Sequence, residues 1–214
     1  LGKHDLSKKT AAIIGIGAIG TNTANLLTRA GLNLILIDHD KIEESNINSQ
    51  SIYTSKDIGK KKAETAARYF GEINPGIRIE YHNIKINKEN INKAKSNIIL
   101  DCTDNMETRF LLNDYCKKNN IPLVHSAAIK SIGTIFTVYK GPCLRCIYSS
   151  TKILEDCSTS GILNTTASLI ASIQANEALK ILAKKPHEKS LLRKNLNNNE
   201  ITKIKINKSC HLCQ

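Results

Sequence analysis

Four cysteines form two pairs at the spacing that metal sites use. Cys143 and Cys146 lie in "GPCLRC", and Cys210 and Cys213 lie in "KSCHLCQ" near the end of the sequence. Two residues between cysteines let both thiolates face one ion, and four sulfurs complete a closed tetrahedral Zn²⁺ site. A redox-active pair is the alternative. We predict structural zinc bound by all four cysteines.

A glycine-rich turn has the spacing of a nucleotide-binding loop. Gly15, Gly17 and Gly20 form G-x-G-x-x-G between an expected strand and an expected helix, and Asp38 ends the next expected strand. The glycines let a phosphate approach the positive helix N-terminus, and an acid at this position binds ribose hydroxyls. This motif alone favours a dinucleotide dehydrogenase, and a purely structural turn is the other alternative.

Polar residues at later positions argue against hydride transfer. "DIGKKKAE" offers lysines at the start of a helix, and "LDCTDN" places Asp101 and Asp104 after an apolar strand. Asp104 suits Mg²⁺ shared with phosphates, and a nearby lysine would neutralise charge on a leaving pyrophosphate. Asp104 as the N-cap of the following helix is the alternative.

These residues need a sheet whose strand ends meet. Apolar runs such as "NLILIDHD", "SNIILDCTDN" and "IPLVHSAAI" predict strands, and stretches such as "METRFLLNDYCKKNN" predict helices between them. This alternation predicts an α/β fold: a Rossmann-like, mainly parallel sheet with helices on both faces. "GTIFTVYKG" and "ITKIKI" predict further strands, the second in an antiparallel C-terminal extension, and a long helix is expected from residue 163.

Composition limits the class of protein. The 214 residues carry a net charge of +12, which fits a solvated basic surface, an acidic protein partner or, less well, nucleic acid, because only nine residues are aromatic. No apolar run is long enough to cross a bilayer, and no export signal is evident. We expect a cytoplasmic protein with reduced thiols.

The ordered motifs resemble the ThiF/MoeB/HesA group of the ubiquitin-activating-enzyme superfamily. G-x-G-x-x-G, D-x-D, S-N-x-x-x-Q, D-I-G-K-x-K and D-C-T-D-N are followed by "PCLRC", "CSTSGIL", "SIQANEALKIL" and the last C-x-x-C. The resemblance implies an ATP- and Mg²⁺-dependent adenylyltransferase that activates the C-terminal carboxylate of a ubiquitin-like sulfur carrier ending in Gly-Gly. It also implies a homodimer. Alternatives are adenylation of another carboxylate or a tRNA base, and a nucleotide-binding partner without turnover.

The resemblance also implies a domain plan and a set of site residues. We expect a single domain over 1–214, with a nucleotide-binding core at 1–140 and a zinc-clamped part with a crossover loop at 141–214. Lys62 would contact phosphates, Asp104 would hold Mg²⁺, and Cys157 matches a cysteine that some members use for covalent sulfur transfer; these three are the catalytic candidates. The implied nucleotide-binding residues are Gly15, Gly17, Gly20, Asp38, Asp40, Ser45, Asn46, Asn48, Ser49, Lys62, Asp104 and Asn105.

Four other residues receive weaker expectations. Cys102 and Cys116 are expected to be unreactive core thiols, and His125 a structural histidine. Arg109 stands at an arginine position of the family, where it would either support Asp104 or lie near phosphate.

Two departures from the family pattern concern arginine. Ser49 replaces the arginine that usually precedes the glutamine of S-N-x-x-x-Q, and the first arginine is Arg29, whereas the family usually carries one in an N-terminal segment that reaches a partner subunit's nucleotide. Either the sequence is trimmed at its start, or two phosphate-binding arginines are absent. In the second case we expect slower adenylation or a different substrate, because serine lacks the forked charge that binds phosphate. Lys60 and Lys61 are the candidates for compensation.

Overall fold

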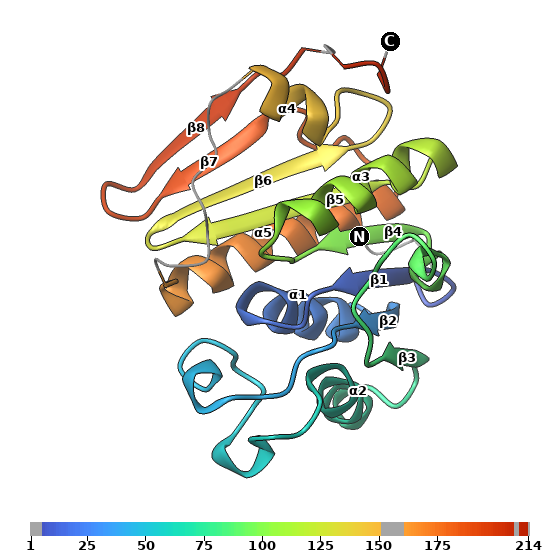
Figure 1. Ribbon diagram of the computed structural model, residues 1–214, viewed down its shortest axis with the longest axis vertical. Coiled ribbons are helices and arrows are strands. Elements are labelled where there is room, and N and C mark those ends of the chain that lie inside the picture. The colour runs from blue at the N-terminus through green and yellow to red at the C-terminus, as the bar shows by residue number, and fades with distance from the viewer. Residues whose placement is uncertain (1–5, 151–160, 208–209, 214) are drawn as a thin grey trace.

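One mixed sheet organises the protein. The computed structural model describes residues 6–150, 161–207 and 210–213 (Figure 1). Five strands are parallel: β1 (Thr10–Ile14), β2 (Asn33–Ile37), β3 (Ile79–His82), β4 (Ile98–Asp101) and β5 (Leu123–Ile129). Three antiparallel strands follow: β6 (Ile132–Val138), β7 (Leu191–Asn195) and β8 (Glu200–Ile204). The order β3-β2-β1-β4-β5-β6-β7-β8 confirms the predicted fold class.

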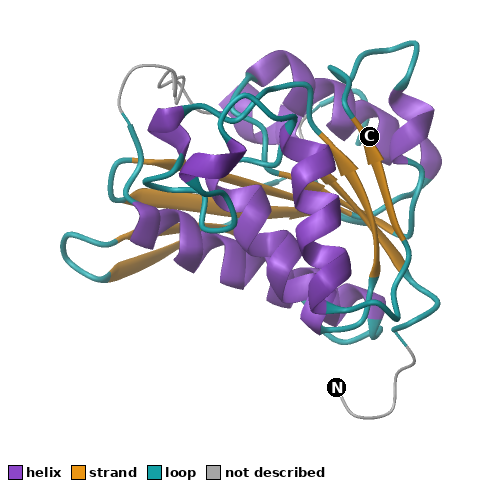
Figure 2. Ribbon diagram, turned by 90° about the horizontal axis from the view of Figure 1, so that it is seen from below, coloured by secondary structure: helices purple, strands orange, loops and turns teal. Residues whose placement is uncertain are grey.

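Helices cover both faces of the sheet, as Figure 2 shows. One face packs against α1 (Ala18–Arg29), α2 (Lys62–Ile73) and α5 (Asn164–Leu182). The other packs against α3 (Met106–Asn119) and α4 (Leu144–Ser150). Three short 3₁₀ helices lie in connections: η1 (Glu44–Asn46), η2 (Ser55–Asp57) and η3 (Ile91–Ala94).

Strand β1 shows why the sheet needs both layers. Ala11 and Ile13 belong to the core under α1, whereas Ala12 and Ile14 belong to the core under α3, and all four are at most 2% exposed. Because successive strand residues point to opposite faces, a strand buried on both sides must be a continuous apolar run. Full burial of an isoleucine side chain stabilises the fold by roughly 1.5 to 3 kcal/mol.

The connections reverse direction at the middle of the sheet. From β1 the chain runs outward through β2 to β3, and it then returns to β4 on the other side of β1, where Ile14 pairs with Asp101. In open α/β sheets, ligands bind beside the carboxyl ends of strands at such a switch point. The fold therefore places the glycine turn after β1 next to the "LDCTDN" loop after β4.

Strands β7 and β8 form the predicted antiparallel C-terminal extension, because they continue the sheet beyond β6. The division of the chain at residue 140 stays a prediction. Within the described ranges, no helix has both the length and the apolar character required to span a bilayer.

Candidate functional site

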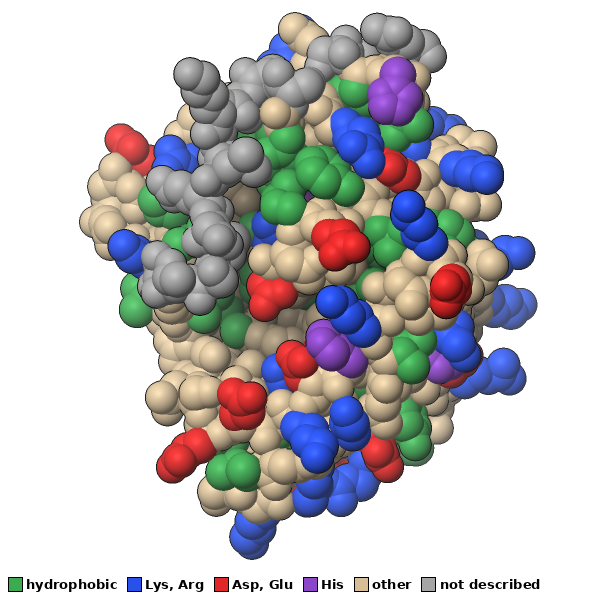
Figure 3. All heavy atoms as spheres, viewed as in Figure 1, with side chains coloured by type: hydrophobic (Ala, Val, Ile, Leu, Met, Phe, Trp, Pro, Cys, Tyr) green, Lys and Arg blue, Asp and Glu red, His purple; other side chains and the backbone are tan. Residues whose placement is uncertain are grey.

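A cleft of about 810 Å³ opens at the carboxyl ends of the five parallel strands. Its walls come from the ends of β1 and β2, residues 84–86 after β3, residues 102–105 after β4, and the last part of β5. In Figure 3 this face of the molecule is hollowed near its centre, with acidic side chains at the rim. Ten of the predicted nucleotide-binding residues line the cleft: Gly15, Gly17, Asp38, Asp40, Ser45, Asn46, Ser49, Lys62, Asp104 and Asn105. Gly20 and Asn48 do not.

The glycine turn is required by close packing. A Cβ atom on Gly15, whose φ is +89°, would lie 2.7 Å from the Cys102 carbonyl oxygen, and one on Gly20 would meet the Gly15 carbonyl oxygen at 1.9 Å. Gly20 therefore supports the turn from behind. Gly17 caps α1 with no side-chain hydrogen bond, and Gly17, Ala18 and Ile19 line the cleft, so an anion bound there can reach the amide groups of the first helical turn.

Asp38 joins the glycine turn to the loop after β2. Its Oδ2 accepts a hydrogen bond from the Ile16 amide at 2.7 Å, and its Oδ1 accepts one from the Asp40 amide at 2.8 Å. A carboxylate has about four acceptor positions, so these bonds leave positions for ribose hydroxyls. The side chain is thus fixed by the backbone before any ligand arrives.

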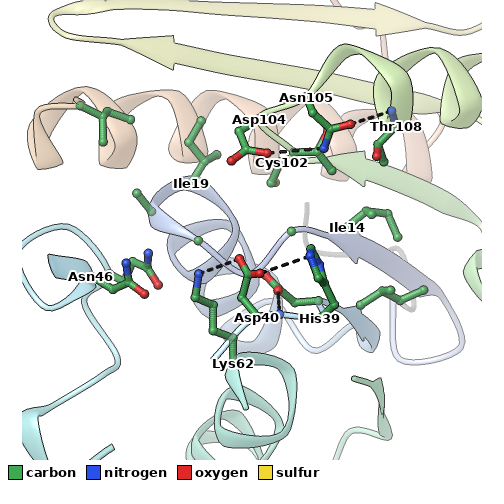
Figure 4. Close-up of a pocket in the computed structure, with 18 of the residues that line it drawn as sticks. Ile14, Ile19, His39, Asp40, Asn46, Lys62, Cys102, Asp104, Asn105 and Thr108 are labelled. Carbon is green, nitrogen blue, oxygen red and sulfur yellow. Dashed lines mark hydrogen bonds and ion pairs between the residues drawn. The ribbon is translucent and has the colours of Figure 1, made fainter. Parts of the chain in front are cut away.

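Lys62 begins α2 and points into the cleft. Its Nζ lies 3.2 Å from Asp40 Oδ2, and the lysine side chain is 9% exposed while that of Asp40 is 50% exposed. His39 Nε2 also lies 3.3 Å from Asp40 Oδ1. Figure 4 shows this group on one wall of the cleft and Asp104 on the other.

Neither proposed substitute for the missing arginine lines the cleft. Lys60 Nζ pairs with Asp57 Oδ1 at 2.8 Å, and Lys61 Nζ donates to the His39 carbonyl oxygen at 2.8 Å. Both lysines line a separate pocket between α2 and β3. The described geometry gives the compensation hypothesis no support, and it stays a prediction for the exchange assay.

The loop after β4 presents Asp104 to solvent. The N-cap of α3 is Asn105, whose Oδ1 accepts a hydrogen bond from the Thr108 amide at 2.9 Å, so the N-cap interpretation of Asp104 is wrong. Arg109 is 4% exposed and donates to the Thr103 carbonyl oxygen from Nε at 3.3 Å and Nη2 at 2.7 Å. Arg109 thus supports the loop, and Asp104 is available as an oxygen ligand.

A buried acid beneath this loop holds it in place. Asp101 accepts hydrogen bonds from the amide and hydroxyl of Thr103 at 3.0 and 2.7 Å, and its Oδ2 lies 2.7 Å from His125 Nδ1. Burial would raise the pKa of Asp101, but the hydrogen bond and charge of His125, with Arg109, outweigh it and lower that pKa. This buried contact with Asp101 fits the expectation of a structural histidine.

Gln174 of α5 connects four elements below the cleft. Its Oε1 accepts from Thr23 Oγ1 at 2.8 Å and from Cys102 Sγ at 3.2 Å. Its Nε2 donates to the carbonyl oxygens of Asp101 at 3.1 Å and Val124 at 2.8 Å. The side chain is fully buried, so every polar atom of this amide is used.

The thiols of Cys102 and Cys116 fit the expectation that they are unreactive. Burial raises the pKa of the Cys102 thiol to about 12, and burial also raises the pKa of the Cys116 thiol well above its usual range. A thiol that stays protonated is a poor nucleophile. Cys157 lies outside the described residues.

The four predicted zinc ligands come together in one buried cluster. The sulfurs of Cys143, Cys146, Cys210 and Cys213 lie within 4.8 Å of one another, with Cys210 Sγ at 3.4 Å from Cys143 Sγ and 3.5 Å from Cys146 Sγ. Sulfurs around a tetrahedral zinc ion lie about 3.8 Å apart. Each pair forms its own tight turn, and the two turns are alike. In each, the amide of the second cysteine donates a hydrogen bond to the carbonyl oxygen of the first at 3.0 Å. The donor set and its spacing fit Zn²⁺.

Several cleft residues escaped the sequence analysis. Gln50 is 6% exposed and ends the S-N-x-x-x-Q motif, so the signal was present in the sequence. Lys85 and Ala128 also line the cleft, from segments that carry no motif. Only the rule that strand ends meet at one edge could have indicated them.

The sequence is similar to a known family and to characterised proteins along most of its length. The model of the ThiF family matches residues 1–214. The SAMP-activating enzyme E1 of Haloferax volcanii is 35% identical over 188 residues, which are 85% of this chain and 70% of that protein. The sulfur carrier protein ThiS adenylyltransferase of Bacillus subtilis is 35% identical over 212 residues, 95% of this chain and 63% of that protein.

A solved structure shows the same fold. The crystal structure of E. coli MccB with AMPCPP and MccA superposes with a TM-score of 0.88 at 22% identity, over 98% of this chain and 67% of that one. The chain therefore spans about two thirds of the length of these three proteins.

Proposed function

The chain belongs to the ThiF family, and from this premise we propose that it is an ATP-dependent adenylyltransferase of a sulfur-carrier protein. One observation carries the proposal: the glycine turn, Asp38, Lys62 and Asp104 come from four elements and line one cleft. A nucleotide bound there would place its phosphates at the N-terminus of α1 and its ribose beside Asp38.

The reaction proposed is the activation of a carboxylate. The C-terminal carboxylate of the carrier attacks the α-phosphorus of ATP, the bond from that phosphorus to the bridging oxygen breaks, and pyrophosphate leaves with both electrons of the bond. The product is an acyl-adenylate. A carboxylate is already ionised at neutral pH, so no general base is needed, and the protein contributes positioning and charge stabilisation.

Lys62 must exchange one partner for another in this scheme. In the described structure it pairs with Asp40, whose side chain is half exposed. Because Asp40 is open to solvent, its carboxylate can move into water when a phosphate takes its place beside Lys62. Lys62 then neutralises charge that develops on the leaving pyrophosphate.

Two metal ions belong to the proposal. Asp104 would hold Mg²⁺, an ion that typically takes only one or two carboxylates from the protein and would neutralise charge on the phosphates. The exposed position of Asp104 on the cleft wall fits that role. The four-cysteine cluster would hold Zn²⁺ in a closed structural site.

The partner, the assembly and Cys157 also belong to the proposal. The carrier would end in Gly-Gly, and the protein would act as a homodimer, which sedimentation analysis can test. Cys157 would attack the acyl-adenylate as a thiolate, forming a thioester and releasing AMP. The activated carrier would serve a thiamine, molybdopterin or thiolation pathway, and a tRNA substrate is not favoured.

Pyrophosphate exchange tests the proposed reaction. Purified protein is incubated with ATP, labelled pyrophosphate and, separately, the SAMP and ThiS carriers of the two named relatives. We expect carrier-dependent exchange that falls about 10²- to 10³-fold in Asp104→Ala and Lys62→Ala, since each removes a group that stabilises transition-state charge. Lys60→Ala is the matched control, because this lysine pairs with Asp57 away from the cleft, and it should keep near-normal exchange.

Two negative outcomes have different meanings. ATP binding without exchange for any carrier would favour a nucleotide-binding partner without turnover. Absence of ATP binding would refute the nucleotide site itself.

A further inference from the structure

Tyr53 touches two parts of the cleft without lining it. The side chain is 4% exposed, and its hydroxyl oxygen lies 3.2 Å from the Ile16 carbonyl oxygen and 3.1 Å from the Lys62 carbonyl oxygen. Ile16 is the residue between Gly15 and Gly17 of the turn, and Lys62 is the first residue of α2. One buried hydroxyl therefore lies between the phosphate-binding turn and the phosphate lysine.

The hydroxyl is held in its donor form. Burial, with the negative charges of Asp38 and Asp57, raises the pKa of Tyr53 above its ordinary value. A protonated phenol has one hydrogen to donate, and both neighbours are carbonyl oxygens that only accept. The hydroxyl therefore donates to either oxygen or is shared between them.

Both the turn and the start of α2 are also hydrogen-bonded to residues of the loop after β2. The Ile16 amide donates to Asp38 Oδ2, and the Lys62 amide donates to the Asp40 carbonyl oxygen at 3.1 Å. These bonds fix each element to the loop after β2. Tyr53 adds a link between the turn and α2 themselves, through the carbonyl oxygens of Ile16 and Lys62.

We propose that Tyr53 is a positioning residue that sets the separation between the glycine turn and Lys62, so that one triphosphate can contact both. The inference rests on the proposed function, because it assigns ATP to this cleft. Ser49 increases the importance of this distance. Where the family pattern has an arginine, serine supplies no charge, and Lys62 carries more of the phosphate contact.

Tyr53→Phe removes the hydroxyl and keeps the ring. We expect ATP to bind about five- to tenfold more weakly, because the turn and Lys62 are no longer held at one separation before ATP binds, while adenosine binding changes less than about twofold. Adenosine has no phosphate and does not need the turn and Lys62 at a fixed separation. Tyr69→Phe is the matched control, because Tyr69 lies on α2 with its side chain partly exposed and should leave both affinities unchanged.

A double-mutant cycle separates positioning from a purely structural role. If Tyr53 acts through Lys62, then adding Tyr53→Phe to Lys62→Ala should weaken ATP binding by less than about twofold further. Equal weakening of ATP and adenosine binding, or additive losses in the double variant, would overturn the proposal.

Hydrogen exchange of the ligand-free protein gives a readout that does not depend on the reaction. In Tyr53→Phe, peptides covering residues 14–18 and 60–64 should both exchange faster, whereas Tyr69→Phe should leave both unchanged. Unaltered protection in Tyr53→Phe would overturn the link between the two elements even if adenylation is found. Faster exchange in a protein that fails to bind ATP would keep the link and refute the proposed function.

Discussion

The four sulfurs of the cysteine cluster lie within 4.8 Å of one another and every one of these cysteines is at most 8% exposed, whereas Asp40 and Asp104 stand on the open walls of the cleft. The cluster joins two segments that are distant in the chain, since Cys146 of one and Cys210 of the other are 64 residues apart. The cleft is made by the ends of five strands.

This difference separates stability from reactivity. The cluster has one set of like ligands, so losing one ligand leaves buried thiols without a metal that satisfies them. In the cleft, a side chain can be held by backbone groups independently of the other side chains, as Asp38 is by two amides. A change in the cluster should therefore unfold part of the protein, and a change on the cleft wall should stop the reaction in a folded protein.

Loss of one zinc ligand gives the largest expected effect on stability. We expect Cys213→Ser to reduce bound zinc from about one ion per chain to near zero and to lower the free energy of unfolding by at least about 3 kcal/mol, because metal binding is coupled to folding. In a protein of this size that corresponds to a fall in Tm of roughly 6 to 12 °C. Elemental analysis and thermal unfolding measure both quantities.

Cys116→Ala is the control for that experiment. It also removes a buried sulfur, but one outside the cluster, so zinc content should stay unchanged. A Cys213→Ser protein with full stability and no zinc would contradict the structural role, and reversible thiol oxidation would then favour the redox alternative.

The cluster and the glycine turn were the most predictable parts of the site. Both depend on short motifs whose spacing is fixed by covalent geometry, as in "GPCLRC" and "GIGAIG". The direction of a charged side chain is not encoded this way. Lys60, Lys61 and Lys62 are adjacent in sequence, yet only Lys62 enters the cleft, because α2 begins there and places its neighbours elsewhere.

The fold was predictable where burial imposed an apolar pattern. β1, β2 and β4 are buried runs that indicate strands by themselves. Strand β7, with sequence "LLRKN", was missed because its polar pattern becomes a strand only through pairing with β6 and β8. Helix α4 was missed as well, since it is short and its start is fixed by distant contacts, such as the Leu144 amide donating to Asn113 Oδ1.

Gln174 tests whether the floor of the cleft behaves like the cluster. We expect Gln174→Leu to lower the free energy of unfolding by about 3 kcal/mol, because several buried polar groups, including two carbonyl oxygens, lose a partner. Asn176→Ala, an exposed amide on the same helix, should change it by less than about 0.5 kcal/mol. Chemical denaturation measures both. Equal stability of the two variants would show that the hydrogen bonds of Gln174 beneath the cleft do not stabilise the fold.

Asp57 gives the smallest expected effect and depends on pH. Its Oδ2 accepts hydrogen bonds from the Thr54 amide at 3.1 Å and hydroxyl at 2.8 Å, while Lys60 Nζ binds Oδ1 at 2.8 Å, beside α2 and outside the lining of the cleft. The Lys60 hydrogen bond is the largest cause that lowers the pKa of Asp57 from 3.8 to about 2.

A carboxyl group whose folded pKa is depressed stabilises the fold above its unfolded pKa and loses this effect as pH falls through the folded value. We expect Asp57→Asn to cost about 1 kcal/mol at neutral pH, because the amide removes the negative charge that pairs with Lys60. The difference from the parent protein should shrink as pH falls from about 4 to about 2. Urea unfolding across this range measures it. A gap that persists at the lowest pH would show that the asparagine disturbs packing instead, and a parallel loss of pyrophosphate exchange would show that this side of α2 also positions Lys62.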